Sequence, residues 1–313
     1  MSKNRSPHLS RRSVLAAPLL SIGAPGRAVS VLDPLQFKIG GGQIDVRFDA
    51  GSFDVGRDGI GKWVSDAAGA VTAYYGRFPV SQTVVEVRPV ASRAGVFGGV
   101  TYNSQPTQTN IEVGERTSRA VFADDWTMTH ELTHLAFPNM PRRHHWIEEG
   151  IATYVEPIAR AQAGTLQVDK VWADMVSDMP KGEPRPDSDG LDEDHSWAST
   201  YWGGALFCLF ADVQFRERTG NRRGLQDALR GILDAGGNIH ADWPIERALK
   251  IGDTTAGAPI LMELYAKAKD KPLSMDLPDL WRRLGVARAG GTVSLSPDAE
   301  LSAIRIAITA KRR

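Results

Sequence analysis

Two histidines four residues apart, with a glutamate directly after the first, form the strongest chemical signal in this 313-residue chain. They are His130, Glu131 and His134, in the stretch TMTHELTHLAF. On an α-helix, residues four apart lie about 40° from one another around the axis and roughly 6 Å along it, so both imidazoles can bind one metal ion. Glu131 lies about 100° further round, where it can reach a water on that ion without binding the metal. The spacing predicts a zinc site with a general base.

A third metal ligand has to come from elsewhere in the chain. Phe137 and Met140 stand where a glycine and a third histidine would have to follow on the same helix. The segment PNMP ends that helix, because proline cannot continue it, and the stretch WIEEGIATY predicts a second helix running back along the first. This helix carries the adjacent Glu148 and Glu149. Neighbours 100° apart are not distinguished by helical geometry alone, so the residues leave both glutamates open.

The pattern W-x-x-E-G-x-A-x-Y, which begins at Trp146, resembles the third-ligand helix of the gluzincin metallopeptidases of the peptidase MA-like clan. In that family the glutamate before the glycine binds zinc, so the resemblance implies that Glu149 joins His130 and His134 around one Zn2+ ion. Three protein ligands leave the fourth position to a water whose pKa falls to about 7 on the metal. Glu131 would accept the proton of that water and return it to the leaving amine. The expected reaction is hydrolysis of an amide without a covalent enzyme intermediate.

A longer stretch, TYWGGALFCLFADVQFRERTGNRRGLQDALRGIL, is similar to the helix after the zinc site in the glycyl aminopeptidase family. The closing LWRRLGV and AELSAIRIAI are similar to C-terminal parts of catalytic domains in the same clan. In related enzymes a downstream tyrosine hydrogen-bonds the developing oxyanion, and Tyr201 matches that position. The resemblance implies an α+β, thermolysin-like catalytic domain. A small N-terminal α/β lobe with an edge strand and a mainly helical C-terminal lobe would have the zinc site between them.

The segment GGVTYN matches the edge strand of those relatives. It predicts one feature shared with them and one difference in specificity. Gly98, Gly99 and Val100 are expected to offer backbone groups to an extended peptide substrate. Thr101 stands where the aminopeptidase relatives have a glutamate that binds the free amine of the substrate, so the residue behind that specificity is missing at this position. Thr153 is a further departure, because some gluzincins have an aspartate there that orients a zinc histidine.

Hydrophobic periodicity predicts which helices and strands carry these motifs. Apolar residues at helical spacing between Ile60 and Tyr74 predict a helix, TVVEVRPV predicts a buried strand, and VFGGVTYN and TNIEVGE predict two strands joined by SQPTQ. The Pro-, Gly- and Asp-rich segment 177–196 predicts a long surface loop. Residues 29–125 are expected to form the N-terminal lobe and 126–285 the helical lobe, with 286–313 as a tail packed on it. Further helices are expected at about Asp124–Phe137, Arg143–Ala161, Ser199–Thr219, Gly224–Asp234, Pro244–Leu249, Ala258–Ala268 and Leu277–Leu284.

The first 28 residues are typical of an export signal. SRRSVL resembles a twin-arginine signal, and small residues precede a plausible cut near Ala28. The apolar run from about Val14 to Ile22 is shorter than the roughly 20 residues that span a bilayer. A disordered basic tail is the alternative interpretation. We expect an exported protein, periplasmic or secreted, without a membrane anchor.

The charge balance and the cysteine content limit the possible partners and cross-links of the chain. Residues 1–28 hold five of the 37 basic residues and none of the 37 acidic ones, so 32 basic residues remain against 37 acidic ones. This balance argues against nucleic acid as a partner. The one cysteine, Cys208, lies in an apolar run and is expected in the core, without an intramolecular disulfide.

The leading interpretation is an exported zinc metallopeptidase that acts on peptides or proteins. One alternative is a catalytically inactive peptidase-like fold that serves as a binding or scaffold module, and another is a zinc hydrolase of a non-peptide amide. Glu131 favours an enzyme, because a structural zinc site is usually closed by a fourth protein ligand and needs no general base. The sequence predicts neither the oligomeric state nor the choice between endo- and exopeptidase.

Overall fold

A five-stranded sheet forms the N-terminal part of the structure, a computed structural model that describes residues 33–184, 188–273, 275–290 and 292–311. Its order is β1-β2-β3-β5-β4, in which β2, β3 and β5 are parallel and the edge strands β1 and β4 are antiparallel to their neighbours. One long side of β4 is therefore free of strand pairing among the described residues. The strands are β1 (Leu35–Ile39), β2 (Gly42–Phe48), β3 (Gln82–Val90), β4 (Val96–Tyr102) and β5 (Thr107–Gly114).

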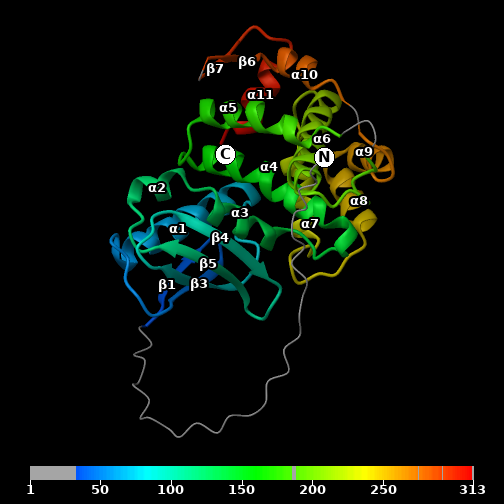
Figure 1. The fold of residues 1–313 in the computed structure, drawn as a ribbon. Helices are drawn as coiled ribbons and strands as arrows, with labels where there is room; N and C mark the ends of the chain where they lie inside the picture. Colours follow the sequence, from blue (N-terminus) through cyan, green and yellow to red (C-terminus); the bar gives the residue numbers. More distant parts are fainter. Residues whose placement is uncertain (1–32, 185–187, 274, 291, 312–313) are drawn as a thin grey trace, which may run out of the picture. The chain divides into compact units, whose positions relative to one another are not determined.

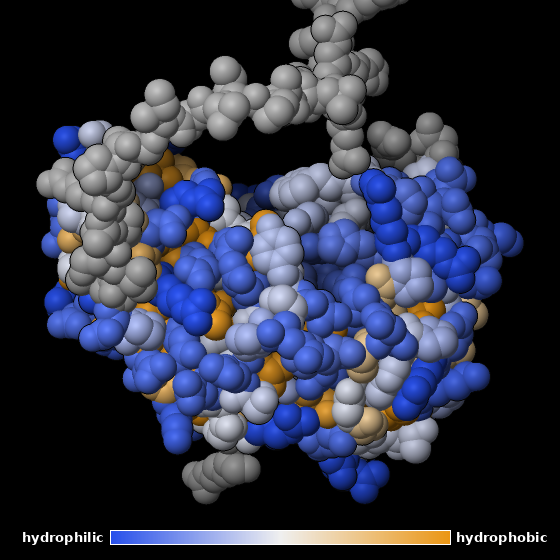
Figure 2. Space-filling view, turned by 90° about the horizontal axis from the view of Figure 1, so that it is seen from below, coloured by the Kyte–Doolittle hydropathy of each residue, from blue (hydrophilic) through white to orange (hydrophobic). Residues whose placement is uncertain are grey.

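The two faces of the sheet differ in polarity. Helix α1 (Gly56–Tyr75) packs on the sheet and on α3, and it ends at Gly76, whose left-handed backbone (φ 83°) closes the last turn. The central strand β3 has β-branched residues in the core, as expected for a strand covered by helices. The other face bears ion pairs of Arg88 with Asp49 and Glu112. The lower side of the view in Figure 1 is mostly hydrophilic (Figure 2).

The rest of the described chain is mainly helical (Figure 1). Helix α4 packs against α1, α3, α5, α6 and α11, so it lies at the centre of the helical elements. The short antiparallel pair β6–β7 contacts α5. The elements are α2 (Arg119–Asp124), α3 (Thr127–Thr133), α4 (His145–Ala163), α5 (Val168–Asp178), a π-helix (Ala198–Gly203), α6 (Gly204–Thr219), α7 (Leu225–Asp234), α8 (Ile245–Ala256), α9 (Ile260–Ala268), α10 (Leu277–Leu284), β6 (Val286–Ala289), β7 (Thr292–Leu295) and α11 (Ser302–Thr309), with 3-10 turns at His134–Ala136, Arg142–His144 and Met179–Gly182.

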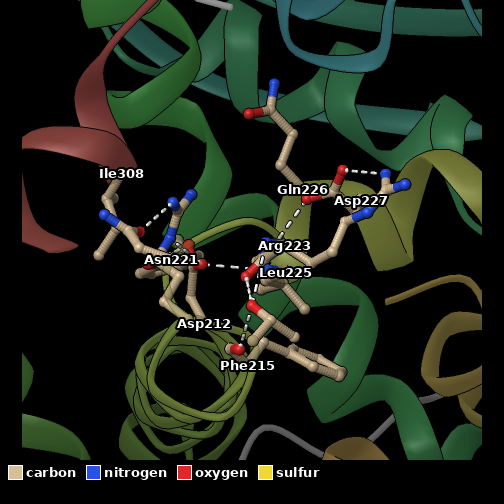
Figure 3. A network of polar contacts seen from close by, with 12 residues as sticks. Asp212, Phe215, Asn221, Arg223, Leu225, Gln226, Asp227 and Ile308 are labelled. Atoms are coloured by element: carbon tan, nitrogen blue, oxygen red, sulfur yellow. Dashed lines mark hydrogen bonds and ion pairs between the residues drawn. The ribbon is translucent and has the colours of Figure 1, made fainter. Parts of the chain in front are cut away.

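A buried polar network joins α4, α6 and α7, and Figure 3 labels three of its members on the last two helices, Asp212, Leu225 and Gln226. Asp212 on α6 is 2% exposed and accepts hydrogen bonds from Arg216 Nε (2.8 Å), from the Leu225 backbone N–H (3.0 Å) and from the Tyr154 hydroxyl of α4 (3.0 Å). A buried carboxylate without such partners would be strongly destabilising, so the network fixes the distance between α4, α6 and the start of α7. Gln226 continues it by donating to the Tyr74 carbonyl at 2.7 Å.

The predicted α+β architecture is confirmed, with the sheet before a helical region. Helix α5 was not predicted, although Val171, Trp172 and Met175 have helical spacing and are buried. Helix α8 continues seven residues beyond the expected end at Leu249. Cys208 is a buried free thiol, as expected. None of the described helices combines the length and the apolar composition that crossing a membrane requires. The predicted signal lies outside the described residues.

Candidate metal centre

The His-Glu-x-x-His motif spans the end of one helix and the following turn. Helix α3 covers Thr127–Thr133 and is buried along its whole length, and His134 opens a 3-10 turn. Trp126 directly precedes the helix, and the carboxylate of Asp125, one residue earlier, accepts the Met128 N–H of the first turn at 3.2 Å. The same oxygen accepts the Trp63 indole N–H at 3.1 Å, which fixes the start of α3 on α1.

The structure brings three predicted ligands together. The Nε2 atom of His130 lies 3.0 Å from Oε2 of Glu149, and Nε2 of His134 lies 3.7 Å from the same oxygen. All three donor atoms lie within 4.8 Å of one another. Zinc binds imidazole nitrogen and carboxylate oxygen at about 2.0–2.2 Å, which puts neighbouring donors of a tetrahedral site roughly 3–4 Å apart. The two-nitrogen, one-oxygen set therefore fits a zinc ion with one position left for water.

Glu148, the alternative left open by the sequence, has other partners. Its carboxylate accepts the Met140 backbone N–H at 3.3 Å and lies 3.3 Å from Nδ1 of His145. It thereby closes the turn between the two motif helices, while Glu149 faces His130.

The electrostatics of the cluster match what metal ligands need. Burial lowers the pKa of His134 to about 4, so this imidazole is neutral at pH 7 and has a free lone pair. Burial would raise the pKa of Glu149, but hydrogen bonds with His130 and His145 and the neighbouring imidazoles outweigh burial. The pKa of this carboxyl is therefore well below its usual value, and Glu149 is ionised.

His145 holds the second oxygen of Glu149. Its Nε2 lies 3.1 Å from Oε1 of Glu149, four residues on, so Oε2 is left for the metal and the histidines. Hydrogen bonding to Glu148, followed by that to Glu149, raises the pKa of His145 to about 10. His145 is thus a charged residue that orients a ligand, and its i,i+4 spacing from Glu149 was the available signal. His144, by contrast, is buried away from the ligands, with Nε2 3.3 Å from Asp192.

Glu131 is held against the edge strand β4. Thr101 Oγ1 lies 2.9 Å from Oε2 of Glu131, 3.0 Å from its backbone oxygen and 3.0 Å from Thr109 Oγ1. A Cβ atom on Gly99 would lie only 2.6 Å from Cγ of Glu131, so the glycine makes room for this side chain. Burial raises the pKa of Glu131, and the charge of Glu149 adds to that effect. A raised pKa suits a group that accepts and returns a proton near neutral pH.

The edge strand presents alternate residues to the site. Gly99 and Thr101 face Glu131, whereas Gly98 and Val100 line a concave region on the open face of the sheet, and Val100 is 50% exposed. The backbone of Gly98, Gly99 and Val100, the three predicted substrate-binding residues, therefore runs beside Glu131, and the one side chain among them, that of Val100, points to the open face of the sheet.

Tyr201 lies beside His130, the first of the predicted histidine ligands. Its ring stacks on that of His130, with centroids 6.0 Å apart and an interplanar angle of 13°. Burial raises the pKa of Tyr201, and the charges of Glu149 and Glu131 raise it further, so its hydroxyl is protonated and can donate a hydrogen bond. The residue belongs to the π-helix, an irregularity that is frequent at functional sites.

The other motif residues of α4 position the ligand without touching it. The Trp146 indole donates to Asp192 at 2.9 Å, and a Cβ on Gly150 would lie 2.3 Å from the backbone of Gly204 on α6. Asp192 is buried although its segment was predicted as a surface loop, because Trp146 and Tyr265 both donate to it.

Thr153 stands where some gluzincins have the aspartate that orients a zinc histidine. The hydroxyl of Thr153 is buried and has no partner among the described residues.

No protein-family model and no curated protein matches this sequence. Solved structures do. An aminopeptidase N family protein from Idiomarina loihiensis matches with a TM-score of 0.59 and 15% identity, over 81% of this chain and 49% of that protein. A two-domain M1 zinc metallopeptidase variant bound to L-arginine matches with a TM-score of 0.52 and 16% identity, over 79% of this chain and 53% of that one.

The described chain has the fold of M1 zinc metallopeptidases. An M1 zinc metallopeptidase from Deinococcus radiodurans also matches, with a TM-score of 0.50 and 17% identity over 78% of this chain and 52% of its own length. The chain spans about half the length of each of these structures. The gluzincin resemblance is confirmed for the fold, and the His130–His134–Glu149 cluster lies within it.

Proposed function

We propose that this chain is a zinc metallopeptidase that hydrolyses peptide bonds. The observation that supports it best is the cluster of His130, His134 and Glu149 with Glu131 beside it, in an M1 fold, in which His134 alone is partly exposed. One bound Zn2+ ion would supply a polarised water and Lewis acidity toward the carbonyl oxygen. A fourth protein ligand would close the site and remove that chemistry, and the three-residue cluster contains none.

The chain's own residues take separate roles in this proposal. Glu131, held by Thr101, accepts a proton from the attacking water and delivers it to the leaving nitrogen. Tyr201 donates its hydroxyl hydrogen to the oxygen that becomes negative in the transition state. His145 keeps Glu149 in the orientation that binds the metal.

The substrate we propose is an extended peptide or protein segment. It would add to the unpaired side of β4, where the backbone of Gly98, Gly99 and Val100 can pair with it. The M1 relative bound to L-arginine has an amino acid as its ligand, which supports substrates of this class. Thr101 has a hydroxyl instead of a carboxylate that could capture a free amine, and this hydroxyl donates to Glu131, so we propose no requirement for an N-terminal residue at the cut.

Residues 1–28 are proposed to direct export through a twin-arginine-type pathway, to the periplasm or beyond. Support comes from SRRSVL, the short apolar run and the small residues near Ala28. The single cysteine is buried and free, so the described fold needs no oxidative step to form.

The test is hydrolysis of a mixed peptide library by the zinc-loaded chain without residues 1–28, beside its Glu131→Gln variant. Cleavage by the parent and a loss of at least about a hundredfold in the variant would support the peptidase, and the cut positions would separate endo- from exopeptidase. Zinc bound at one equivalent without cleavage by either protein would refute it, leaving a binding module or a hydrolase of other amides.

A further inference from the structure

Two exposed tryptophans adjoin the metal cluster. Eight large apolar side chains among the described residues are exposed, and the most exposed of them is Trp197, at 61%. Trp126 is 53% exposed. Trp126 directly precedes α3 and Trp197 directly precedes the π-helix, so each lies beside an element that carries a site residue.

Ring contacts connect both tryptophans to a metal ligand. Trp126 meets the His130 ring edge-on, with centroids 5.3 Å apart and an interplanar angle of 87°. On the face of His130 lies Tyr201, and Trp197 stacks in turn on Tyr201, with centroids 5.7 Å apart at 26°. We call Trp126, Tyr201 and Trp197 the aromatic shelf.

The exposure of the aromatic shelf has no structural benefit for the free protein. A tryptophan buries roughly 150–250 Å² when it packs fully, and here two of them leave more than half of their surface in water. Trp146 and Trp172 show that this fold has buried places for indoles, at 2% and 0% exposure. Exposed apolar surface rimmed by polar residues marks a binding site, and this surface continues directly into the proposed catalytic site.

We propose that the aromatic shelf binds an aromatic side chain of the peptide substrate, within about three residues of the bond that is cut. This proposal rests on the proposed function. The two ring-to-ring steps from His130 to Trp197, 6.0 Å and 5.7 Å, keep the Trp197 ring within roughly the length of three extended residues of His130. An incoming ring would continue the offset stack of Tyr201 and Trp197.

A cationic side chain would also find a favourable face on an indole. The two carboxylates of the site are, however, already bonded: Glu131 to Thr101, and Glu149 to His130 and His145. Because both carboxylates already have partners within the protein, we expect stacking and the burial of an apolar ring to favour an aromatic over a cationic side chain.

The experiment measures kcat/KM for a series of fluorogenic peptides that differ only in one residue near the cut, with Phe, Leu, Lys or Ala at that place. We expect Phe to be preferred to Ala by about tenfold or more. Trp197→Ala should reduce the Phe/Ala ratio to near unity, and Trp197→Phe should restore most of it. Ile306→Ala, which removes a 57% exposed side chain on α11, is the matched control and should keep the parent ratio.

A binding measurement separates this proposal from the proposed function. Calorimetric titration of the zinc-loaded Glu131→Gln protein with the Phe and Ala peptides should show tighter binding of the Phe peptide, by a similar factor, and Trp197→Ala in that background should remove the difference. If no peptide is hydrolysed by the parent but this difference appears, the peptidase is refuted and the shelf stands. Equal Phe and Ala values, a preference for Lys, or a Phe/Ala ratio unchanged in Trp197→Ala would overturn the shelf.

Discussion

Gly150→Ala is expected to damage the metal centre without changing any ligand. Gly150 directly follows Glu149 and lies at the crossing of α4 and α6. A Cβ atom there would lie 2.3 Å from the carbonyl carbon and 2.4 Å from the Cα of Gly204. Backbone atoms on both sides of the contact cannot turn away as a side chain could.

The size of the effect follows from those distances. Ordinary van der Waals contact begins near 3.4 Å, so the helices must separate by about 1.1 Å at the crossing. Overpacking of this kind costs about 1–3 kcal/mol, which corresponds to a Tm lowered by roughly 2–5 °C in a domain of this size. Because misplacing a catalytic group by about 1 Å can cost about a hundredfold, we also expect weaker zinc binding and a kcat/KM lowered by about that factor.

Calorimetric unfolding, zinc competition with a chelator and peptide hydrolysis measure the three effects. The matched control is Gly69→Ala in the interior of α1, where a Cβ meets nothing within 4 Å. This control should stabilise the protein by about 0.5–1 kcal/mol and leave zinc affinity unchanged. Parent-like Tm, zinc affinity and activity in Gly150→Ala would refute the claim that the glycine contact positions Glu149.

Three further changes test two contacts of the site and one buried ion pair on α4. His145→Ala should weaken zinc binding about 10- to 100-fold by releasing Glu149, measured by chelator competition; His145→Gln, which keeps a donor, should lose less. Thr101→Val should lower kcat more than it raises KM and shift the acid limb of the pH–rate profile, while Thr101→Ser restores both; an unchanged profile would contradict its role in holding Glu131. The parent should lose stability as pH rises from about 4.5 to 7, and Glu156→Gln should not show this loss; denaturant unfolding of the metal-free protein measures both.

The sign of the last effect comes from burial. Burial raises the pKa of Glu156 from 4.5 to about 7, and the opposing charge of Arg160, 2.7 Å away, only partly offsets it. Since the folded pKa is above the unfolded one, the contribution to stability is complete below about pH 4.5 and is lost as pH rises through 7. A shift of this size corresponds to about 3 kcal/mol. We expect the unfolding free energy of the parent, relative to that of Glu156→Gln, to fall as pH increases from 4.5 to 7. A relative free energy that stays constant or increases over this range would contradict this account.

Local sequence signals predicted the elements that carry the site. The sequence predicted strands β4 and β5, the helix of the first motif and the helix of the second motif that runs back along it. These predictions were possible because turn residues and apolar spacing are local properties. Thr101 was identified as a departure from the aminopeptidase pattern, but its hydrogen bond to Glu131 was not predictable. That contact depends on how β4 is placed over α3, which no local pattern specifies.

Contacts between distant segments explain two features of the site that composition and helical geometry did not predict. Asp192 lies in a stretch whose composition predicts a surface loop, yet it is buried because it accepts hydrogen bonds from Trp146 and Tyr265. The choice between Glu148 and Glu149 likewise depended on resemblance, since the turn that gives Glu148 its own backbone partner, Met140, lies outside the helix.

The structure divides the second motif into two stripes of one helix. Trp146, Gly150 and Tyr154 recur every four residues and all meet α6: the indole packs edge-on to Phe207, the glycine touches Gly204, and the hydroxyl donates to Asp212. His145 and Glu149, also four apart, form the neighbouring stripe that faces the histidines. The ligand stripe lies about 100° from the packing stripe, so close packing against α6 fixes the rotation of α4 and with it the direction of Glu149. The tryptophan, glycine and tyrosine of the motif would therefore serve the proposed metal binding through helix orientation rather than through contact with the metal.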